Sequence, residues 1–194
     1  MLRVLAISGS ARAASRSTAL LRALASAADE QAVVQVMADL AALPGFSPDS
    51  EGPPAPSAVE ALLAAIAAAD AVVVACPEYV HSFTGILKNA IDWCVSRPEI
   101  IHKPIVLAHA SHRGDEMLGQ LRRVLETVSS RFGSGIFLRV PIASLAEAEV
   151  TVVLEAAETR AAMIVFLDEL AGWVRNDQIS DASVSKTGNS RAFG

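Results

Sequence analysis

Short, entirely apolar runs alternate with longer segments of helical periodicity along most of the chain. The runs at 4–7, 71–76 and 105–108 contain no polar side chain. A short apolar run of this kind indicates a strand buried on both faces of a sheet. Parallel strands need long crossovers, usually helices, whereas antiparallel strands can be joined by tight turns. The alternation therefore predicts an α/β domain whose parallel sheet is covered by helices on both faces.

The remaining elements follow from the same periodicities. Further strands are expected at 33–36 and 136–140. Apolar residues at helical spacing predict helices around 20–28, 57–66, 83–95, 117–128 and 150–173. Ser57 and Glu60 have the spacing of a capping box at the start of the second helix. We expect one domain over residues 1–174 and a polar, flexible C-terminal tail over 175–194.

Composition narrows the classes of function. The 194 residues carry a net charge of −5 and no Lys/Arg-rich tract, which argues against a nucleic-acid partner. No charge-free stretch of about 20 apolar residues occurs, so no membrane span is predicted. The two cysteines, Cys76 and Cys94, form no CxxC motif, and a reducing, cytoplasmic setting is expected. We interpret Cys76 as a small buried residue rather than a nucleophile.

The first polar segment, residues 9–18, joins the first strand to the first helix. A helix N-terminus presents free N–H groups and a positive dipole end, which favour an anion. Arg12 adds a fixed charge. Four hydroxyl residues stand in the same segment: Ser10, Ser15, Ser17 and Thr18. The segment suits a phosphate monoester, although the serines could instead only cap the helix. Neither a P-loop nor a GxGxxG pattern is present.

The second segment, residues 77–93, follows the third strand and reads PEYVHSFTGILKNAIDW. Open α/β sheets bind ligands beyond the carboxyl ends of their strands, at the point where strand order reverses. In a flavodoxin-type order that point lies between the first and third strands. The loops at 9–17 and 77–85 are therefore expected to share one crevice.

Together the two segments resemble those of the NADPH-dependent FMN reductases, a group that includes quinone, azo and chromate reductases. The family pattern near the start is G-S-x-R-x-x-S, matched here at Gly9, Ser10, Arg12 and Ser15. The second pattern is P-E-Y-N-x-S-x-x-G-x-L-K-N-A-I-D-W. It is matched throughout 77–93 except at Val80, where the family usually has Asn. The resemblance extends over about residues 1–140.

The resemblance implies a flavodoxin-like three-layer sandwich with a five-stranded parallel sheet and bound FMN. It assigns the FMN phosphate to Ser10, Arg12, Ser15, Ser17 and Thr18. It assigns the ribityl chain and isoalloxazine ring, largely through backbone groups, to Pro77, Glu78, Tyr79, Val80, His81 and Ser82. An Asn at position 80 could hydrogen-bond the flavin, whereas Val has no donor or acceptor. The alternative is that Val80 merely packs.

A third loop, residues 110–114, follows the fourth strand. The family tends to carry Ser-x-Gly-x-x-Gly-Gly here, with amides that approach the pyrimidine edge of the flavin. This chain keeps Ser111 but has a single glycine, Gly114. His109 and His112 are a conceivable metal pair. No third ligand stands nearby in the sequence, and we predict no metal site.

The implied activity is FMN-dependent NAD(P)H oxidoreductase. NADPH or NADH would pass a hydride to FMN, which then passes two electrons to a small acceptor such as a quinone, azo compound, flavin or metal oxyanion. No catalytic side chain is predicted, because the flavin supplies the chemistry. The alternatives are a non-enzymatic flavodoxin-like electron carrier and a reductase that releases reduced FMN to a monooxygenase.

The resemblance also implies a homodimer or homotetramer. The family builds part of its interface from the helix that carries Lys88, Asn89 and Trp93. From the residues alone, Trp93 is interpreted as ordinary core packing, and Lys88 with Asp92 as an exposed i,i+4 pair.

Overall fold

A computed structural model describes residues 1–187, with side chains described through Asn176. Five strands form one parallel sheet in the order β2-β1-β3-β4-β5. They are β1 (Leu2–Ser8), β2 (Ala32–Met37), β3 (Ala71–Ala75), β4 (Ile105–His109) and β5 (Phe132–Arg139). The predicted α/β fold with a five-stranded parallel sheet is confirmed.

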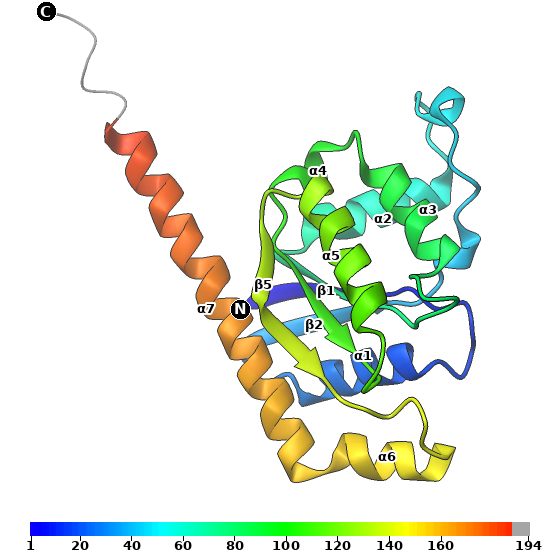
Figure 1. Cartoon of the computed structure of the whole chain (residues 1–194). Coiled ribbons are helices and arrows are strands. Elements are labelled where there is room, and N and C mark those ends of the chain that lie inside the picture. The colour runs from blue at the N-terminus through cyan, green and yellow to red at the C-terminus, as the bar shows by residue number, and fades with distance from the viewer. Residues whose placement is uncertain (188–194) are drawn as a thin grey trace, which may run out of the picture.

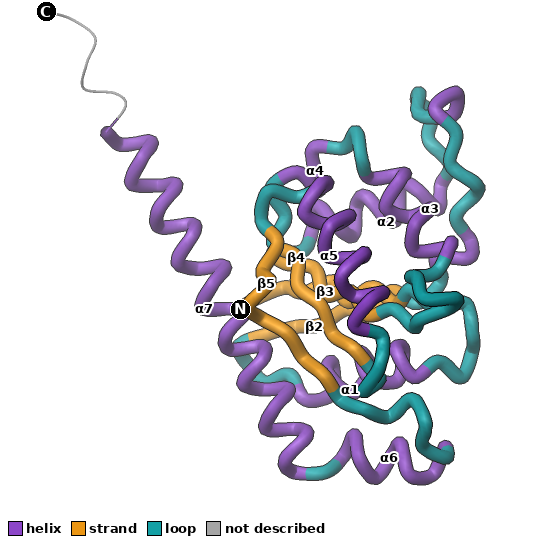
Figure 2. The backbone as a smooth tube through the Cα atoms, in the orientation of Figure 1, coloured by secondary structure: helices purple, strands orange, loops and turns teal. Residues whose placement is uncertain are grey.

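Helices cover both faces of the sheet (Figures 1 and 2). One face carries α1 (Arg16–Ala27), α6 (Glu147–Glu155) and α7 (Ala157–Thr187). The other carries α2 (Ser57–Ala68), α3 (Gly85–Cys94), the short α4 (Pro98–Ile101) and α5 (Asp115–Val128). Side chains alternate between the two faces, so Val4 and Ala6 enter the first core while Leu5 and Ile7 enter the second. Both cores therefore form from the same apolar strand runs.

Two of the sequence predictions for these elements are wrong. Strand β5 begins at Phe132, before the expected 136, because Gly133 and Gly135 interrupt the apolar pattern. A Cβ at Gly133 would lie 2.9 Å from the ring of Trp173, so close packing excludes a side chain there. Helix α2 has Pro56 at its N-cap and no side-chain cap, so the capping box at Ser57 does not form.

The prediction for the C-terminal helix is also wrong. Two helices, α6 and α7, replace the single helix expected at 150–173, and they meet at Ala156. Helix α7 continues to Thr187, so the backbone of 175–187 is helical, and this part of the helix extends away from the sheet (Figure 1). The rest of the expected tail, 188–194, lies outside the described residues. Flexibility of the tail stays a prediction.

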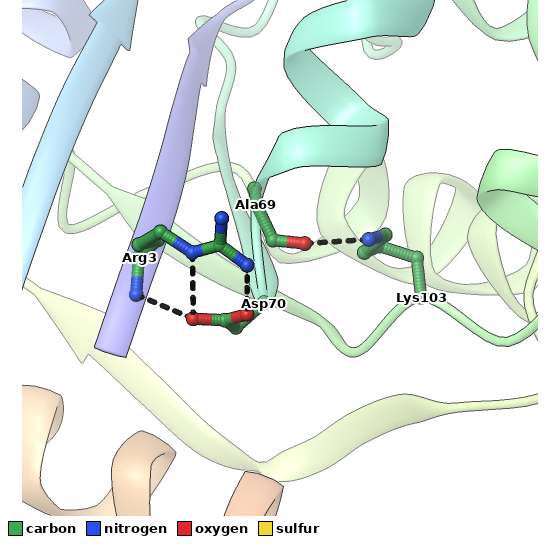
Figure 3. Close-up of polar contacts among 4 residues, drawn as sticks. All are labelled: Arg3, Ala69, Asp70 and Lys103. Atoms are coloured by element: carbon green, nitrogen blue, oxygen red, sulfur yellow. Dashed lines mark hydrogen bonds and ion pairs between the residues drawn. The ribbon is translucent and has the colours of Figure 1, made fainter. Parts of the chain in front are cut away.

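The amino-terminal edge of the sheet is held by polar contacts (Figure 3). The Arg3 guanidinium lies 2.8 Å from Asp70, and the Arg3 amide donates to the same carboxylate at 2.8 Å. The hydrogen bond from the Arg3 side chain lowers the pKa of Asp70. Lys103 donates to the Ala69 carbonyl at the C-terminal end of α2. These contacts tie the start of β1 to the entry of β3, at the edge opposite the predicted site loops.

Candidate flavin site

The loops after β1 and β3 meet at the carboxyl edge of the sheet. The Thr84 hydroxyl donates to the Gly9 carbonyl at 2.6 Å, across 75 positions of sequence. The Gly9 amide donates to the Ala75 carbonyl at 2.8 Å. A Cβ at Gly9 would lie 2.8 Å from the sulfur of Cys76, so only glycine permits this close approach. The two sequence motifs are therefore adjacent in space.

The hydroxyls of the first loop are mostly used within the protein. Ser15 is the N-cap of α1, and its Oγ accepts from the Thr18 amide at 3.3 Å. Ser10 Oγ accepts from the Arg12 amide at 3.3 Å. The buried Thr18 hydroxyl pairs with Ser8 at 2.8 Å, and Ser17 is also buried. Capping is thus observed, and Thr18 faces inward.

The same loop leaves positive charge without a partner. Within the described side chains, the exposed Arg12 guanidinium makes no hydrogen bond or ion pair. The first turn of α1 contains no acidic residue. The first amides of a helix have no acceptor inside it. An anion held here would meet the Arg12 charge, free amides and the positive helix end, which fits the phosphate of FMN.

The second loop makes a tight turn at Val80 and His81. The backbones of Tyr79 and Ser82 hydrogen-bond each other at 2.9 and 3.1 Å. Val80 and His81 have φ values of 52° and 59°, in the left-handed region. Asn adopts this conformation far more readily than a β-branched residue. The departure from the family pattern at Val80, which is 94% exposed, therefore bears on backbone conformation.

Helix α5 supports the turn through Gln120. Ser82 Oγ donates to Gln120 Oε1 at 2.8 Å, and Gln120 Nε2 donates to the His81 carbonyl at 3.1 Å. No sequence motif marks Gln120, because it lies within an ordinary amphipathic helix. The exposed His81 ring lies 3.5 Å from the Glu78 carboxylate and 3.4 Å from that of Glu116. Its side chain faces these two acids.

The third loop lies against the second. Ser111 Oγ accepts from the Arg113 amide at 3.1 Å, which shapes the loop. Gly114 has a φ of 97°, and a Cβ there would lie 3.1 Å from the Glu78 carboxylate and 2.9 Å from Nε2 of His109. The structure thus brings together all three loops that carry the predicted site residues.

Two neighbouring side chains are buried. Cys76 is free and buried, as predicted, and burial raises the pKa of its thiol. The Nε2 of His109 is bonded to a backbone carbonyl. In the part of the chain that the structure describes, no three His, Cys, Asp or Glu side chains gather as a metal site.

Helix α3 uses its motif residues within the chain. Trp93 is buried as interpreted, and its Nε1 donates to the Pro44 carbonyl at 2.8 Å. Asn89 bonds the backbones of Pro44 and Phe46. Lys88 and Asp92 form the expected i,i+4 pair. The apolar side chains of this helix, among them Leu87 and Ile91, face the chain's own core and offer no exposed apolar patch for a dimer.

The sheet order, with the site loops at the switch between β1 and β3, defines a doubly wound, flavodoxin-like α/β protein. The chain belongs to the NADPH-dependent FMN reductase family, whose family model matches residues 2–139. That span includes all three loops.

Curated relatives agree with this assignment. The chain is 38% identical over 112 residues to an NAD(P)H-dependent FMN reductase of Pseudomonas aeruginosa, covering 57% of this chain and 60% of the relative. It is 36% identical over 115 residues to a quinone reductase of Escherichia coli, with the same two coverages. The matches thus span about three fifths of the length of these relatives.

The fold has close structural neighbours. A flavoenzyme NAD(P)H:(acceptor) oxidoreductase from Paracoccus denitrificans superimposes with a TM-score of 0.74 at 23% identity, covering 91% of this chain and 98% of the neighbour. An NADH:FMN oxidoreductase structure superimposes with a TM-score of 0.54 at 21% identity, covering 88% and 89%. At this identity the likeness concerns the fold. Over the described residues, no helix has the length and apolar character needed to cross a membrane.

Proposed function

We propose that this chain binds FMN between the loops after β1, β3 and β4 and catalyses reduction of a small acceptor, such as a quinone, by NADPH or NADH. Membership of the FMN reductase family supports the cofactor and the reaction. One structural observation supports the proposed position of FMN. The hydrogen bond from Thr84 to Gly9 joins the two motif loops at the point where strand order reverses. FMN, when bound, supplies hydride and electron transfer.

The first loop is proposed to hold the phosphate end of the cofactor. Arg12 provides a charge-assisted donor, and the first amides of α1 provide neutral ones. The side chains of Ser10 and Ser15 fix the backbone of this loop by accepting from its own amides. The buried Thr18 hydroxyl supports this loop indirectly, because its hydrogen bond with Ser8 joins the start of α1 to the end of β1.

The second and third loops are proposed to hold the ring end. The turn at 79–82 presents backbone groups, and its exposed Tyr79 offers an aromatic surface beside them. Ser111 and Gly114 shape the loop on the other side. No acid or base is assigned, because hydride transfer needs position and exclusion of water rather than proton transfer at a side chain.

The setting of the activity is also part of the proposal. A cytoplasmic location fits two free, buried cysteines. A homodimer or homotetramer is proposed from the family resemblance. The contacts between subunits must use side chains other than the apolar ones of α3, such as Leu87 and Ile91, because these are buried in the core of the chain.

A steady-state assay tests the reaction. Protein supplied with FMN should oxidise NADPH or NADH in the presence of a simple quinone, and the donor and acceptor should give parallel double-reciprocal lines because they share one crevice. Intersecting lines would count against a shared site. Activity that requires free FMN as the acceptor, with no tightly bound flavin, would favour a reductase that releases reduced FMN.

A further inference from the structure

His109 is a buried, titratable residue that the proposed function has not used. It is the last residue of β4 and is 2% exposed. Its Nε2 lies 2.7 Å from the carbonyl oxygen of Arg113. A carbonyl only accepts, so Nε2 carries the hydrogen and donates it. The other ring nitrogen, Nδ1, has no hydrogen-bond partner among the described residues.

This hydrogen bond closes the third loop onto the strand that precedes it. Donor and acceptor are four positions apart, so the backbone from 110 to 113 must turn back over the imidazole. The ring also fills the space next to Gly114, because a Cβ at Gly114 would lie 2.9 Å from Nε2 and 3.2 Å from Cε1 of His109. The imidazole therefore sets where Gly114, and with it the start of α5, can lie.

The ring also connects this loop to the second loop. In the sheet Ala108 is paired with Ala75, so His109 lies beside Cys76, the residue immediately before the second loop. The carboxylate of Glu78 reaches within 3.1 Å of the position that a Cβ at Gly114 would take. His109 thus lies between the end of β3 and the third loop, beneath the place where two loops of the proposed cofactor site approach each other.

We propose that His109 is a positioning residue of the flavin site, whose imidazole holds the 110–114 loop at the separation from the 77–82 loop that the isoalloxazine ring requires. This rests on the proposed function, because it takes FMN to bind between these loops. The ring acts through the Arg113 carbonyl and Gly114 and does not itself touch the cofactor. Burial lowers the pKa of His109 more than the Arg113 carbonyl raises it, so the ring is neutral near pH 7.

Two substitutions of similar volume separate positioning from packing. His109→Leu fills the space without a donor, whereas His109→Gln keeps an N–H group at the reach of Nε2. The control is His102→Leu, because the exposed His102 bonds Ser130 near the opposite end of β4. Quenching of flavin fluorescence gives FMN affinity, and the visible spectrum of the saturated protein reports on the surroundings of the ring.

We expect His109→Leu to weaken FMN binding about ten-fold, the effect of one lost hydrogen bond in a buried site, and to shift the visible flavin band. His109→Gln should bind within about three-fold of wild type and restore the spectrum. His102→Leu should match wild type in both measurements. Circular dichroism checks that each variant folds. If the Leu variant does not fold, His109→Asn takes its place, because its shorter amide cannot reach Arg113.

The outcomes distinguish the two proposals. Wild-type affinity and spectrum in the Leu or Asn variant would overturn the positioning role while leaving FMN binding intact. A Gln variant as weak as the Leu variant would also overturn it, because His109 would then act by packing alone. A wild-type protein that does not bind FMN would overturn the proposed function and this proposal together.

Discussion

Val80 occupies a backbone conformation that suits the Asn of its relatives better than a β-branched side chain. Its φ of 52° and its 94% exposure leave little packing to compensate for the strain. We expect Val80→Asn to raise the free energy of unfolding by about 1 kcal/mol and to tighten FMN binding a few-fold by pre-organising the turn. Urea unfolding and an FMN titration measure these effects. A less stable Asn variant would show that the turn is not strained at this residue.

Arg12 is the one charged side chain assigned to the cofactor phosphate. We expect Arg12→Ala to weaken FMN binding about thirty-fold, or about 2 kcal/mol, because a charge-assisted hydrogen bond is lost. Arg22→Ala, on the exposed face of the helix α1 that follows this loop, removes equal charge away from the site and should have little effect. A fluorescence titration compares them. Equal affinity in both variants would remove Arg12 from the phosphate site.

His109 also makes stability depend on pH. Burial lowers the pKa of His109 in the folded protein, so the unfolded chain takes up its proton first. The contribution of the neutral His109 ring to the free energy of unfolding should be fully present above pH 6.5, the ordinary pKa of histidine. It should fall as the pH decreases below 6.5, until the pKa of His109 in the folded protein is reached. Arg139, which lowers this pKa, and Asp115, which raises it, are the nearby charges. Urea unfolding at pH 7.5 and 5.5 measures the loss of unfolding free energy between the two pH values. We expect a smaller loss for His109→Gln than for the wild-type protein, and an equal loss would exclude His109 as the cause.

At the scale of elements, Thr84 has two tasks. Its hydroxyl caps α3 by accepting from the Leu87 amide, and it donates to the Gly9 carbonyl of the first loop. We expect Thr84→Val to lower the free energy of unfolding by about 2 kcal/mol, from a lost cap and a buried carbonyl left without its donor. The control is Thr127→Val, since the Thr127 hydroxyl only bonds back to Arg123 within α5. Equal losses in the two variants would contradict the bridging role of Thr84.

The strands were predictable because their apolar runs are long enough to show burial on both faces, as at 4–7 and 71–76. The start of β5 was not, because Gly133 is selected by the ring of Trp173, a contact far away in sequence. The site loops followed from the rule that ligands bind at the strand-order switch. Gln120 and His109 were missed as supports because their roles depend on which backbone carbonyls the fold brings to them.

At the scale of the whole molecule, the two edges of the sheet differ in character. The amino-terminal edge is closed by the Arg3 to Asp70 pair and by Lys103, whose charged groups already have partners. At the carboxyl edge, Arg12 has no partner among the described side chains, and three loops gather, two of which contain left-handed residues, at 80, 81 and 114. The amino-terminal edge is therefore closed by the chain's own ion pair and hydrogen bonds, whereas the carboxyl edge keeps the charge that we assign to the cofactor phosphate.

We propose above all that this chain binds FMN and reduces it with a nicotinamide donor. The most direct measurement is the visible absorbance of the purified protein with one equivalent of FMN, recorded without oxygen before and after NADPH and then after a quinone. We expect a protein-bound flavin spectrum that bleaches with NADPH or NADH and returns with the quinone. Flavin that stays free in solution, or bound flavin that neither donor bleaches, would contradict it.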